Sequence, residues 1–483
     1  MQIRLKCLKQ KYSSLSEPVK ASIWYMVCNI LNKGMALIST PIFTRILTEE
    51  QYGIFSIFRS WYSILIIFTS LNIFLGGYTK GLLIFKNDWK AFTSSLLSLT
   101  TFITCCFGII YCANSASISS FFELPEILMP AMFIELLFMP ALEFWAAKER
   151  FDFKYQKYVI VSFTMTVCSL LGGVLAVLSM NYKVEAKVYS DAIVKGLFCG
   201  FIFVILMKQG KKLYVKKYWI YALKFNIPLI PHYLSNYVLS QSDRIMIGKM
   251  IGTSQAAYYS VAYTISMMMN IIITAINNSL APYIYKSIDA GKARVIKKTV
   301  TPIFVVVGCL SIMTMAFAPE VIYIFAGSNY SEAIYVIPPI AASVFYIFLY
   351  SMFSTVEYFY QKTVKIAVAT CISAGLNLVL NYMFINLFGY HAAGYTTLIC
   401  YILLAFTHFL FYKKILKKEL PNVKNLYDMK IIILVSCVVI MMMFVMLAIY
   451  KFTIIRYSII LITMITLIIK RKTIVISIEN FRK

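Results

Sequence analysis

Four basic residues stand inside long apolar stretches of this sequence, where a charge is hard to accommodate: Lys33, Arg59, Lys195 and Arg244. A lysine or arginine at the centre of a membrane-spanning helix costs about 2.5–3.5 kcal/mol on insertion scales unless it faces a polar interior. Residues that keep such a position usually line a substrate or ion pathway, or pair with another charge. Each of the four is therefore a candidate binding residue.

Lys33 is the strongest of these candidates. It lies about twelve residues into the apolar run 21–43, which is roughly 18 Å along a helix, so its ammonium group is far from either membrane surface. Asn29, four residues earlier, shares its helix face, whereas Asn32 is offset. We expect a cation that faces a polar cavity; the alternative is a lysine paired with a neighbouring helix.

The other candidates allow two interpretations each. Arg59 either faces the interior or extends to the outer membrane surface. Asp191 and Lys195 have the i, i+4 spacing of an ion pair on one helix face, and we favour that pair over Lys195 as a second cavity cation. Asp243 and Arg244 are adjacent and point about 100° apart on a helix. Asp243 and Arg244 either bind the substrate or a coupling ion, or have a structural role at the end of the helix.

Coupling to an ion gradient needs a group that binds a proton or a metal cation. Glu135 is the first choice, because it lies mid-run between Pro130 and Pro140, which are expected to kink the helix and free backbone carbonyls. The slightly favoured alternative for Glu135 is a structural partner for a nearby cation. His232, next to Pro231, is a second choice, although a histidine used only for helix packing is the commoner case.

The chain as a whole has the composition of an integral membrane protein. Its 483 residues are 60% hydrophobic and 14% charged, with a mean hydropathy of +0.76, whereas soluble domains carry about 25% charged residues. A membrane-spanning helix needs about 20 apolar residues, and about fourteen runs qualify. They are 21–43, 54–76, 91–113, 125–146, 158–180, 188–207, 225–247, 256–284, 300–318, 331–352, 366–386, 391–412, 431–450 and 453–469.

Positive charge is distributed unevenly over the connecting segments. Of the 46 Lys and Arg residues, most fall on the side of the N-terminus, in clusters such as KQGKKLYVKK and KKILKKELPNVK. The positive-inside rule makes that side cytoplasmic, together with both termini. Topology then explains the net charge of +26 without a nucleic acid partner, which would need a basic face on a soluble domain. The opposite side is expected to hold Arg45, Lys183, Lys187, Lys249, Lys451 and Arg456.

Motifs for catalysis or metal binding are missing from the sequence. The 11 cysteines lie mostly inside apolar runs, without a CxxC or Cys/His spacing, so we expect neither a disulfide nor a metal site. The stretch MIGKMIGTS lacks the spacing of a phosphate-binding glycine loop. Asn377 and Asn381, one helical turn apart, are assigned to interhelical hydrogen bonds. We therefore expect no catalytic residue and no cofactor.

A weak internal repeat links the two halves of the chain. LTEEQYGIFSIF, which enters the second run, resembles GTSQAAYYSVAY, which enters the eighth, when one gap is allowed. The alignment sets Phe55-Ser56-Ile57 against Tyr259-Ser260-Val261. Because six runs separate the copies, both have the same orientation, as in transporters built from two parallel six-helix halves.

Four stretches together resemble the Wzx-type polysaccharide flippases, a bacterial family in the superfamily that also holds multidrug antiporters and lipid II flippases. The resemblance covers nearly the whole chain in the right order. The stretches are PIFTRILTEEQYGIFSIF, SDRIMIGKMIGTSQAAYYSVAYTI, NSLAPYIY and LNLVLNYMFINLFGYHAAGYTTLICY.

This resemblance implies an all-α fold of about 14 transmembrane helices, with two pseudo-symmetric six-helix lobes in a V around a central cavity. The N-terminal lobe would be residues 1–210 and the C-terminal lobe 211–415, with two further helices and a basic tail in 416–483. The central cavity would open alternately to each leaflet. The four cations, and Asp191, Asp243 and Asn29 as polar residues, would then contact a substrate or a coupling ion in that cavity.

The resemblance also implies a function. Such flippases move undecaprenyl-pyrophosphate-linked oligosaccharides from the cytoplasmic to the outer leaflet of the bacterial plasma (inner) membrane, coupled to an ion gradient, for O-antigen or capsule synthesis. They are not enzymes. The expected partners are the lipid-linked oligosaccharide, membrane lipids and, beyond these, a polysaccharide polymerase and a chain-length regulator.

Three other functions compete with this one. A lipid II flippase or a multidrug antiporter of the same superfamily would share the fold, although an antiporter for cationic drugs would need acidic cavity residues rather than Lys33. A membrane-bound polysaccharide polymerase or glycosyltransferase would usually carry a sizeable outer loop with acids, arginines or histidines. The expected outer loops are short, which favours a transporter.

Overall fold

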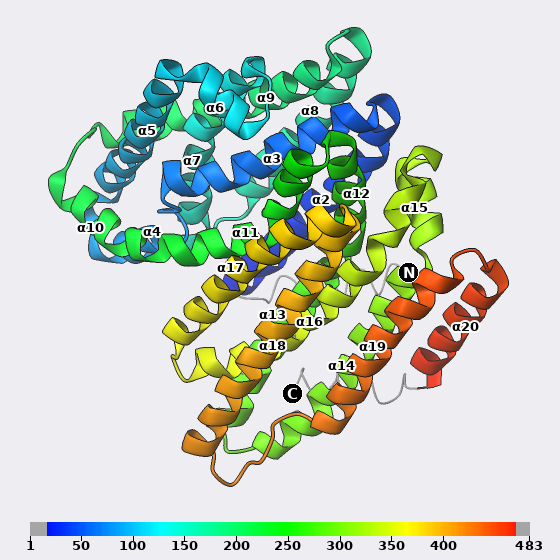
Figure 1. Cartoon of the computed structure of the whole chain (residues 1–483). Coiled ribbons are helices and arrows are strands. Elements are labelled where there is room, and N and C mark those ends of the chain that lie inside the picture. Colours follow the sequence, from blue (N-terminus) through cyan, green and yellow to red (C-terminus); the bar gives the residue numbers. More distant parts are fainter. Residues whose placement is uncertain (1–16, 470–483) are drawn as a thin grey trace, which may run out of the picture. The chain divides into compact units, whose positions relative to one another are not determined.

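Helices and the turns between them make up the computed structural model, which describes residues 17–469 of the 483. Within that range no residue is in a β-strand (Figure 1). The expected all-α class is thus confirmed. By its internal contacts the chain divides into two units: unit 1 runs up to Leu47 and from Ile57 to Leu234, and unit 2 holds Thr48–Ser56 and the chain from Ser235 onward. The division into 1–210, 211–415 and 416–483 stays a prediction.

Unit 1 is organised around one long helix, α9, which packs against α5, α7 and α8, while α2 packs on α8. Its core contains an aromatic group in which the Tyr78 ring stacks on Phe92 at 5.7 Å and meets the edge of Phe144 at 4.9 Å. The Tyr78 hydroxyl is satisfied by Thr93 at 2.7 Å. The helices that lie wholly or mostly in this unit are α2 (Glu17–Ile46), α3 (Glu49–Ser70), α4 (Gly77–Ile84), α5 (Trp89–Ala113), α6 (Ser115–Phe122), α7 (Met129–Phe151), α8 (Gln156–Ser179), α9 (Lys183–Gly210) and α10 (Lys216–Asn226).

Unit 2 is organised around α16, the most deeply buried of the apolar helices, which packs against α12, α13, α14, α18 and α19. Phe304 lies 5.1 Å from Phe348 and 5.8 Å from Tyr427, and all three rings are buried. The helices of this unit are α11 (Ile230–Met250), α12 (Thr253–Met267), α13 (Met269–Asp289), α14 (Ala293–Ala316), α15 (Ala318–Ala326), α16 (Ile337–Phe359), α17 (Thr363–Phe388), α18 (His391–Glu419), α19 (Met429–Ile449) and α20 (Thr453–Ile469).

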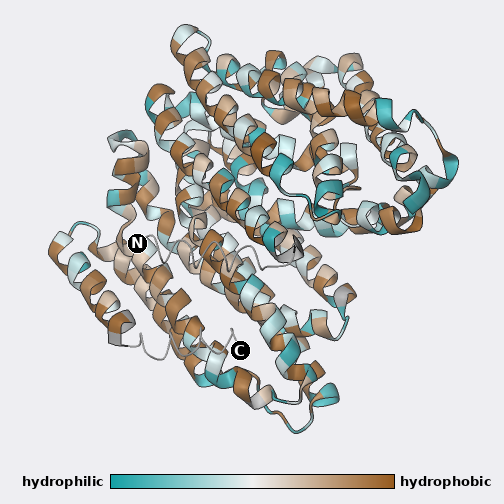
Figure 2. Cartoon of the chain, turned by 180° about the vertical axis from the view of Figure 1, so that it is seen from behind, coloured by the Kyte–Doolittle hydropathy of each residue, from teal (hydrophilic) through white to brown (hydrophobic). Residues whose placement is uncertain are grey.

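Twelve helical stretches in the described part of the chain are long and apolar enough to cross a membrane. Apolar residues cover most of the helices, and hydrophilic ones gather at helix ends and connections (Figure 2). Two expected spans are not among the twelve. The run 225–247 is divided between the short 3-10 helix Ile227–Leu229 and α11, and α20 is only 17 residues long. The count of fourteen therefore stays a prediction.

The internal repeat has a structural counterpart at the start of two helices. Phe55 is the seventh residue of α3, and Tyr259, its match in the alignment, is the seventh of α12. The first turns of both helices lie in unit 2, and they approach closely: a methyl group added to Gly53 would lie 1.9 Å from the carbonyl oxygen of Thr253. Glycine is required there by backbone contact and not by a turn.

Candidate functional site

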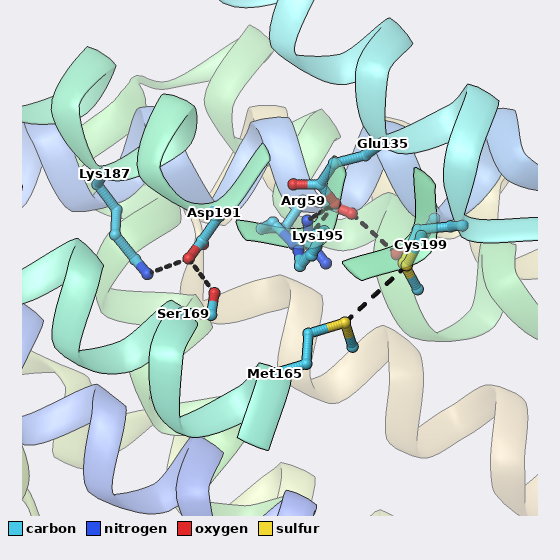
Figure 3. A network of polar contacts seen from close by, with 10 residues as sticks. Arg59, Glu135, Met165, Ser169, Lys187, Asp191, Lys195 and Cys199 are labelled. Carbon is cyan, nitrogen blue, oxygen red and sulfur yellow. Dashed lines mark hydrogen bonds and ion pairs between the residues drawn. The ribbon is translucent and has the colours of Figure 1, made fainter. Parts of the chain in front are cut away.

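The centre of unit 1 contains a carboxylate shared by two cations. Oε2 of Glu135 accepts hydrogen bonds from Nη1 of Arg59 at 2.7 Å and from Nζ of Lys195 at 2.8 Å (Figure 3). The Glu135 side chain is fully buried, whereas 34% of the Arg59 side chain and 14% of the Lys195 side chain remain exposed. The second carboxylate oxygen of Glu135 has no hydrogen-bond partner among the described residues.

Three helices place these groups together. Pro130 stands at the start of α7 and does not kink it, whereas Pro140 lies inside that helix, and Glu135 projects from the segment between them. Lys195 comes from α9, which packs along α7. Arg59 comes from α3, where its guanidinium group also lies 4.7 Å above the ring of Tyr62. The structure thus shows Arg59 turned to an interior carboxylate, and Glu135 in contact with two of the predicted cations.

A second ion pair lies beside the first, on the same helix α9. Oδ1 of Asp191 accepts from Nζ of Lys187 at 2.8 Å and from the hydroxyl of Ser169 at 2.5 Å (Figure 3). The Lys187 ammonium group lies 4.2 Å above the ring of Phe43. Gly173 on α8 leaves room for it, because a methyl group there would lie 2.9 Å from Nζ.

The expected pair of Asp191 with Lys195 is wrong: Lys195 reaches Glu135 on α7, and Lys187, one turn before Asp191, pairs with Asp191 instead. Lys187 lies in the second turn of α9 and is only 4% exposed, and its assignment to the outer side of the membrane stays a prediction. The spacing of Lys187, Asp191 and Lys195, each four residues apart, was the signal for a single charged face.

These side chains form what we call the cationic cluster, defined as Arg59, Glu135, Lys187, Asp191 and Lys195. Three basic groups face two carboxylates, which leaves one formal positive charge. Because effective dielectric constants are low inside proteins, that excess charge acts strongly on a nearby anion. Arg59 is the most exposed member, and its planar guanidinium group suits bidentate recognition of phosphate oxygens.

Lys33 and Asn29 are both exposed on α2, on the same helix face as predicted. Asn32 instead faces α8, where it donates to Ser162 at 2.7 Å and accepts from Thr166 at 3.2 Å. Over residues 17–469 no ion pair or hydrogen bond to the Lys33 side chain is formed. The alternative of a lysine paired with a neighbouring helix is therefore not what the structure shows.

His232 lies at the start of α11, half-buried, with its ring 6.0 Å from that of Tyr233. The structure does not bring it to the cationic cluster, whose members come from α3, α7 and α9. Both interpretations of His232, a coupling residue and a packing histidine, stay predictions.

Unit 2 contains a different polar group, which we call the carboxylate cluster: Asp243, Tyr259, Asn377, Asn381 and Thr397. Asp243 is fully buried. Its Oδ2 accepts from the Tyr259 hydroxyl and from Thr397 at 2.9 Å, and its Oδ1 accepts from the Asn381 amide at 2.6 Å. Asn381 also donates to Asn377 at 3.2 Å. The expected interhelical hydrogen bonds of the two asparagines are thus confirmed.

Arg244 points away from this cluster. It donates to the Ser240 carbonyl at 2.9 Å and to the Gln241 side chain at 2.6 Å, and its guanidinium group lies 4.4 Å from the centre of the Tyr263 ring. Asp243 and Arg244 therefore serve different faces, as their adjacency predicts. Among the described residues, Asp243 accepts hydrogen bonds only from neutral donors, two hydroxyls and one amide N–H, so no positive charge is paired with its carboxylate.

The sequence interpretation missed one buried pair in unit 2. Nδ1 of His408 on α18 lies 2.7 Å from Oε1 of Glu357 on α16, and both side chains are fully buried. Glu357 lies beyond the predicted end of the run 331–352, so nothing marked it as a membrane residue. A group of three or more His, Cys, Asp or Glu residues able to hold a metal is not found in the described residues.

The fold and the charged interior define a class: a membrane protein of many apolar helices. The family model of polysaccharide biosynthesis proteins matches residues 19–288, and the MatE model matches residues 228–383. The chain belongs to the polysaccharide biosynthesis protein family, which confirms the resemblance to polysaccharide flippases.

Individual relatives agree with that assignment. A Haemophilus influenzae protein described as Lsg locus putative protein 1 is 25% identical over 56% of this chain and 67% of its own length. The lipid II flippase MurJ, in an inward closed conformation, aligns over 94% of this chain and all of its own, with a TM-score of 0.73 and 14% identity. An inward-facing multidrug MATE transporter aligns over 82% and 96%, with a TM-score of 0.62 and 13% identity. The fold is that of the MOP superfamily.

Proposed function

We propose that this protein is a flippase that moves undecaprenyl-pyrophosphate-linked oligosaccharide units from the cytoplasmic to the outer leaflet by alternating access, for O-antigen or capsule synthesis. The observation that carries the proposal is the cationic cluster: three basic side chains and two carboxylates among helices apolar enough to cross a membrane. A net positive site lowers the cost of bringing a pyrophosphate into the membrane interior. Membership of the polysaccharide biosynthesis family supports this choice.

Arg59 and Lys195 are the residues that we assign to the pyrophosphate. Both already donate to one oxygen of Glu135, so an entering phosphate competes with that carboxylate for the same N–H groups. Lys33, exposed on α2, adds a point charge without a competing partner among the described residues, and Arg244 is the fourth predicted cation.

The same competition suggests how an ion gradient is coupled to transport. A proton on Glu135 would weaken its hold on Arg59 and Lys195 and would raise the net charge of the cluster, so that proton binding and pyrophosphate binding favour each other. Loss of the proton would restore both ion pairs and release the substrate. Asp243, with neutral donors only, is the second candidate for ion coupling, and Asp191 is assigned to holding Lys187.

A lipid II flippase is the second candidate function, because the MurJ structure aligns over nearly the whole chain. Its substrate carries the same pyrophosphate on the same type of lipid, so the cationic cluster suits both. A multidrug antiporter for cationic compounds fits less well, since the excess charge of the cluster repels them. A polymerase or glycosyltransferase is not supported by the MOP fold.

The remaining elements of the proposal follow from the charge distribution and the family. Both termini are assigned to the cytoplasm and the protein to the bacterial plasma (inner) membrane, with membrane lipids and the lipid-linked oligosaccharide as partners. A polysaccharide polymerase and a chain-length regulator would act on the product. The lobes are assigned to 1–210 and 211–415, followed by 416–483.

Deletion of the gene in its native host tests the proposal. We expect the lipid-linked unit to accumulate in the cytoplasmic leaflet, out of reach of a membrane-impermeant probe until the cells are opened. Wild type should restore surface polysaccharide, and Lys33→Ala and Arg59→Gln should not. Lys208→Gln, an exposed lysine in the last turn of α9, is the matched control and should restore it.

Two outcomes would contradict the proposal. Accumulation in the outer leaflet would place the defect after translocation and indicate a polymerising enzyme. Accumulation of peptidoglycan precursor instead of the oligosaccharide unit would indicate the lipid II function.

A further inference from the structure

A groove of about 700 Å³ opens at the end of unit 1 where α5 begins, α7 ends, α8 begins and α9 ends. None of the residues of the cationic cluster lines it. We call it the basic groove and define it by six of its lining residues: Trp89, Trp145, Lys148, Lys154, Lys157 and Phe201. Its volume lies within the range of about 300–1,000 Å³ that is usual for small-molecule sites.

One end of the basic groove is charged. Nζ of Lys148 lies 2.5 Å from Oδ2 of Asp152, and Nζ of Lys154 lies 3.7 Å from the same oxygen. Lys157 and Glu149 complete the charged lining, so three lysines face two carboxylates and one positive charge is left over. The Lys154 side chain is 68% exposed and Lys157 is also exposed, so both are accessible to an anion.

The opposite wall of the basic groove is apolar and belongs to α9. Leu197 and Phe201 are each 70% exposed, whereas Ile202 and Leu206 are buried beneath them. Because α9 is long and apolar enough to cross a membrane, exposed side chains of this kind are suited to contact with acyl chains and not with water.

Two tryptophans also line the groove. Trp89 is the first residue of α5 and Trp145 lies near the end of α7, and the Lys148 ammonium group sits 4.4 Å above the Trp89 ring. Tryptophan is enriched at the level of lipid headgroups, where its amphipathic ring contacts both apolar and polar groups. The lining of the groove therefore combines charged, amphipathic aromatic and apolar side chains, which suit the three parts of a phospholipid.

From these features we infer that the basic groove is a binding site for one anionic phospholipid. Its phosphate contacts Lys154 and Lys157, its glycerol region lies against the two tryptophans, and one acyl chain follows Leu197 and Phe201 along α9. Three matched features favour this occupant over a free phosphate or a soluble peptide: the excess charge, the interfacial aromatic residues and the exposed apolar wall. The inference does not depend on the proposed transport function.

Native mass spectrometry of the purified full-length protein tests the site, with phosphatidylglycerol and phosphatidylcholine of identical acyl chains as probes. Wild type should bind one phosphatidylglycerol in preference to phosphatidylcholine. A lysine near anionic lipid contributes about a fivefold change in affinity, so Lys154→Gln/Lys157→Gln should weaken phosphatidylglycerol binding about 30-fold. Lys211→Gln/Lys212→Gln removes the same charge from exposed positions just after α9 that do not line the groove, and it should have little effect.

A second variant tests the contact with the acyl chain separately from the contact with the headgroup. Leu197→Trp narrows the apolar wall without changing any charge, and it should weaken phosphatidylglycerol binding at least tenfold, whereas inorganic phosphate at millimolar concentration should not compete with the lipid. The inference would be overturned if wild type bound phosphatidylglycerol and phosphatidylcholine equally, or if both double lysine variants lost the same affinity for phosphatidylglycerol. It would also be overturned if inorganic phosphate displaced the lipid and Leu197→Trp bound it as wild type does.

Discussion

The cationic cluster of unit 1 and the carboxylate cluster of unit 2 stabilise buried carboxylates in opposite ways. In unit 1, Glu135 and Asp191 are both compensated by full positive charges, and one positive charge is left over. In unit 2, Asp243 is fully buried and, among the described residues, accepts only from a tyrosine, a threonine and an asparagine. We therefore propose that unit 1 is suited to an anion and unit 2 to a small cation or a proton.

If the proposed function holds, this difference separates two tasks that an ion-coupled transporter must perform. A substrate site has to stay accessible, and Arg59 keeps a third of its side chain exposed. An ion site has to exclude competing ligands, and the burial of Asp243 does so. The comparison predicts that the two clusters respond differently to the loss of a charge, of a hydroxyl group and of a proton.

The largest expected effect is on the stability of unit 1. Lys187→Met leaves Asp191 buried with only the Ser169 hydroxyl as a hydrogen-bond donor among the described residues, and removal of one member of a buried ion pair costs about 3–5 kcal/mol. Equilibrium unfolding in bicelles measures it. The double variant Lys187→Met/Asp191→Asn should recover most of the loss, and an unchanged unfolding free energy in Lys187→Met would contradict the pairing.

The next largest effect is on transport. Arg59→Gln removes a donor that we assign to the pyrophosphate, and hydrogen bonds to charged groups contribute about 1.5–3 kcal/mol, so transport should fall about 10- to 100-fold. Arg59→Lys should recover part of the lost transport, because it keeps the positive charge. It should not recover all of it, because lysine lacks the planar fork of N–H donors. Transport is measured in proteoliposomes at equal protein amounts. A variant Arg59→Gln with wild-type rates would remove Arg59 from the site.

A matched pair of hydroxyl deletions compares the two clusters directly. Thr397→Val removes one of three neutral donors to Asp243 and should cost about 2 kcal/mol of unfolding free energy. Ser169→Ala removes the donor to Asp191 but leaves Lys187 in place, and it should cost about 1 kcal/mol. The same unfolding measurement applies to both. If Ser169→Ala lost more unfolding free energy than Thr397→Val, then Asp191 rather than Asp243 would be the carboxylate that relies on neutral donors.

The smallest effect concerns the ion pair between Glu320 on α15, a helix too short to span a membrane, and Arg456 at the start of α20. Burial raises the pKa of Glu320, but hydrogen bonds from Arg456 and Tyr457 outweigh it and hold this pKa below its ordinary value of 4.5. A lowered pKa in the folded state adds stability above pH 4.5 that is lost as the pH falls through the folded value.

The Glu320 side chain is 29% exposed although Arg456 is buried, so solvent screens part of this ion pair and its contribution is about 1 kcal/mol. The stability difference between wild type and Glu320→Gln should therefore shrink on going from pH 7 to pH 3, as measured by unfolding at both values. A difference that grows in acid would contradict the sign.

Much of this architecture is predictable from the sequence, because the membrane requires long apolar runs. Most of the predicted runs coincide with helices of the structure, and α3 and α12 begin at matching places in the repeat. The run 225–247 is divided between the 3-10 helix Ile227–Leu229 and α11, because Pro228, Pro231 and the charged and polar residues of α11 interrupt the apolar pattern.

The partners of the charged residues are harder to predict. Spacing along one helix suggested a pair between Asp191 and Lys195, but side chains on neighbouring helices compete for each charge, and helix packing decides which partner wins. Glu135 between Arg59 and Lys195 joins three helices, and the Glu357–His408 pair joins two. The periodicity of a single sequence predicts on which face of its own helix a residue lies, but not which neighbouring helix that face contacts.

Binding of undecaprenyl pyrophosphate to the purified full-length protein tests the assignment of the anion to unit 1 most directly. The informative variants are Arg59→Gln/Glu135→Gln/Lys195→Gln, which removes the central charges without leaving an unpaired ion, and Asp243→Asn in unit 2. We predict that the triple variant loses at least tenfold in affinity and that Asp243→Asn keeps wild-type affinity. Retained binding in the triple variant, with affinity lost in Asp243→Asn, would place the anion site in unit 2 and contradict the proposal.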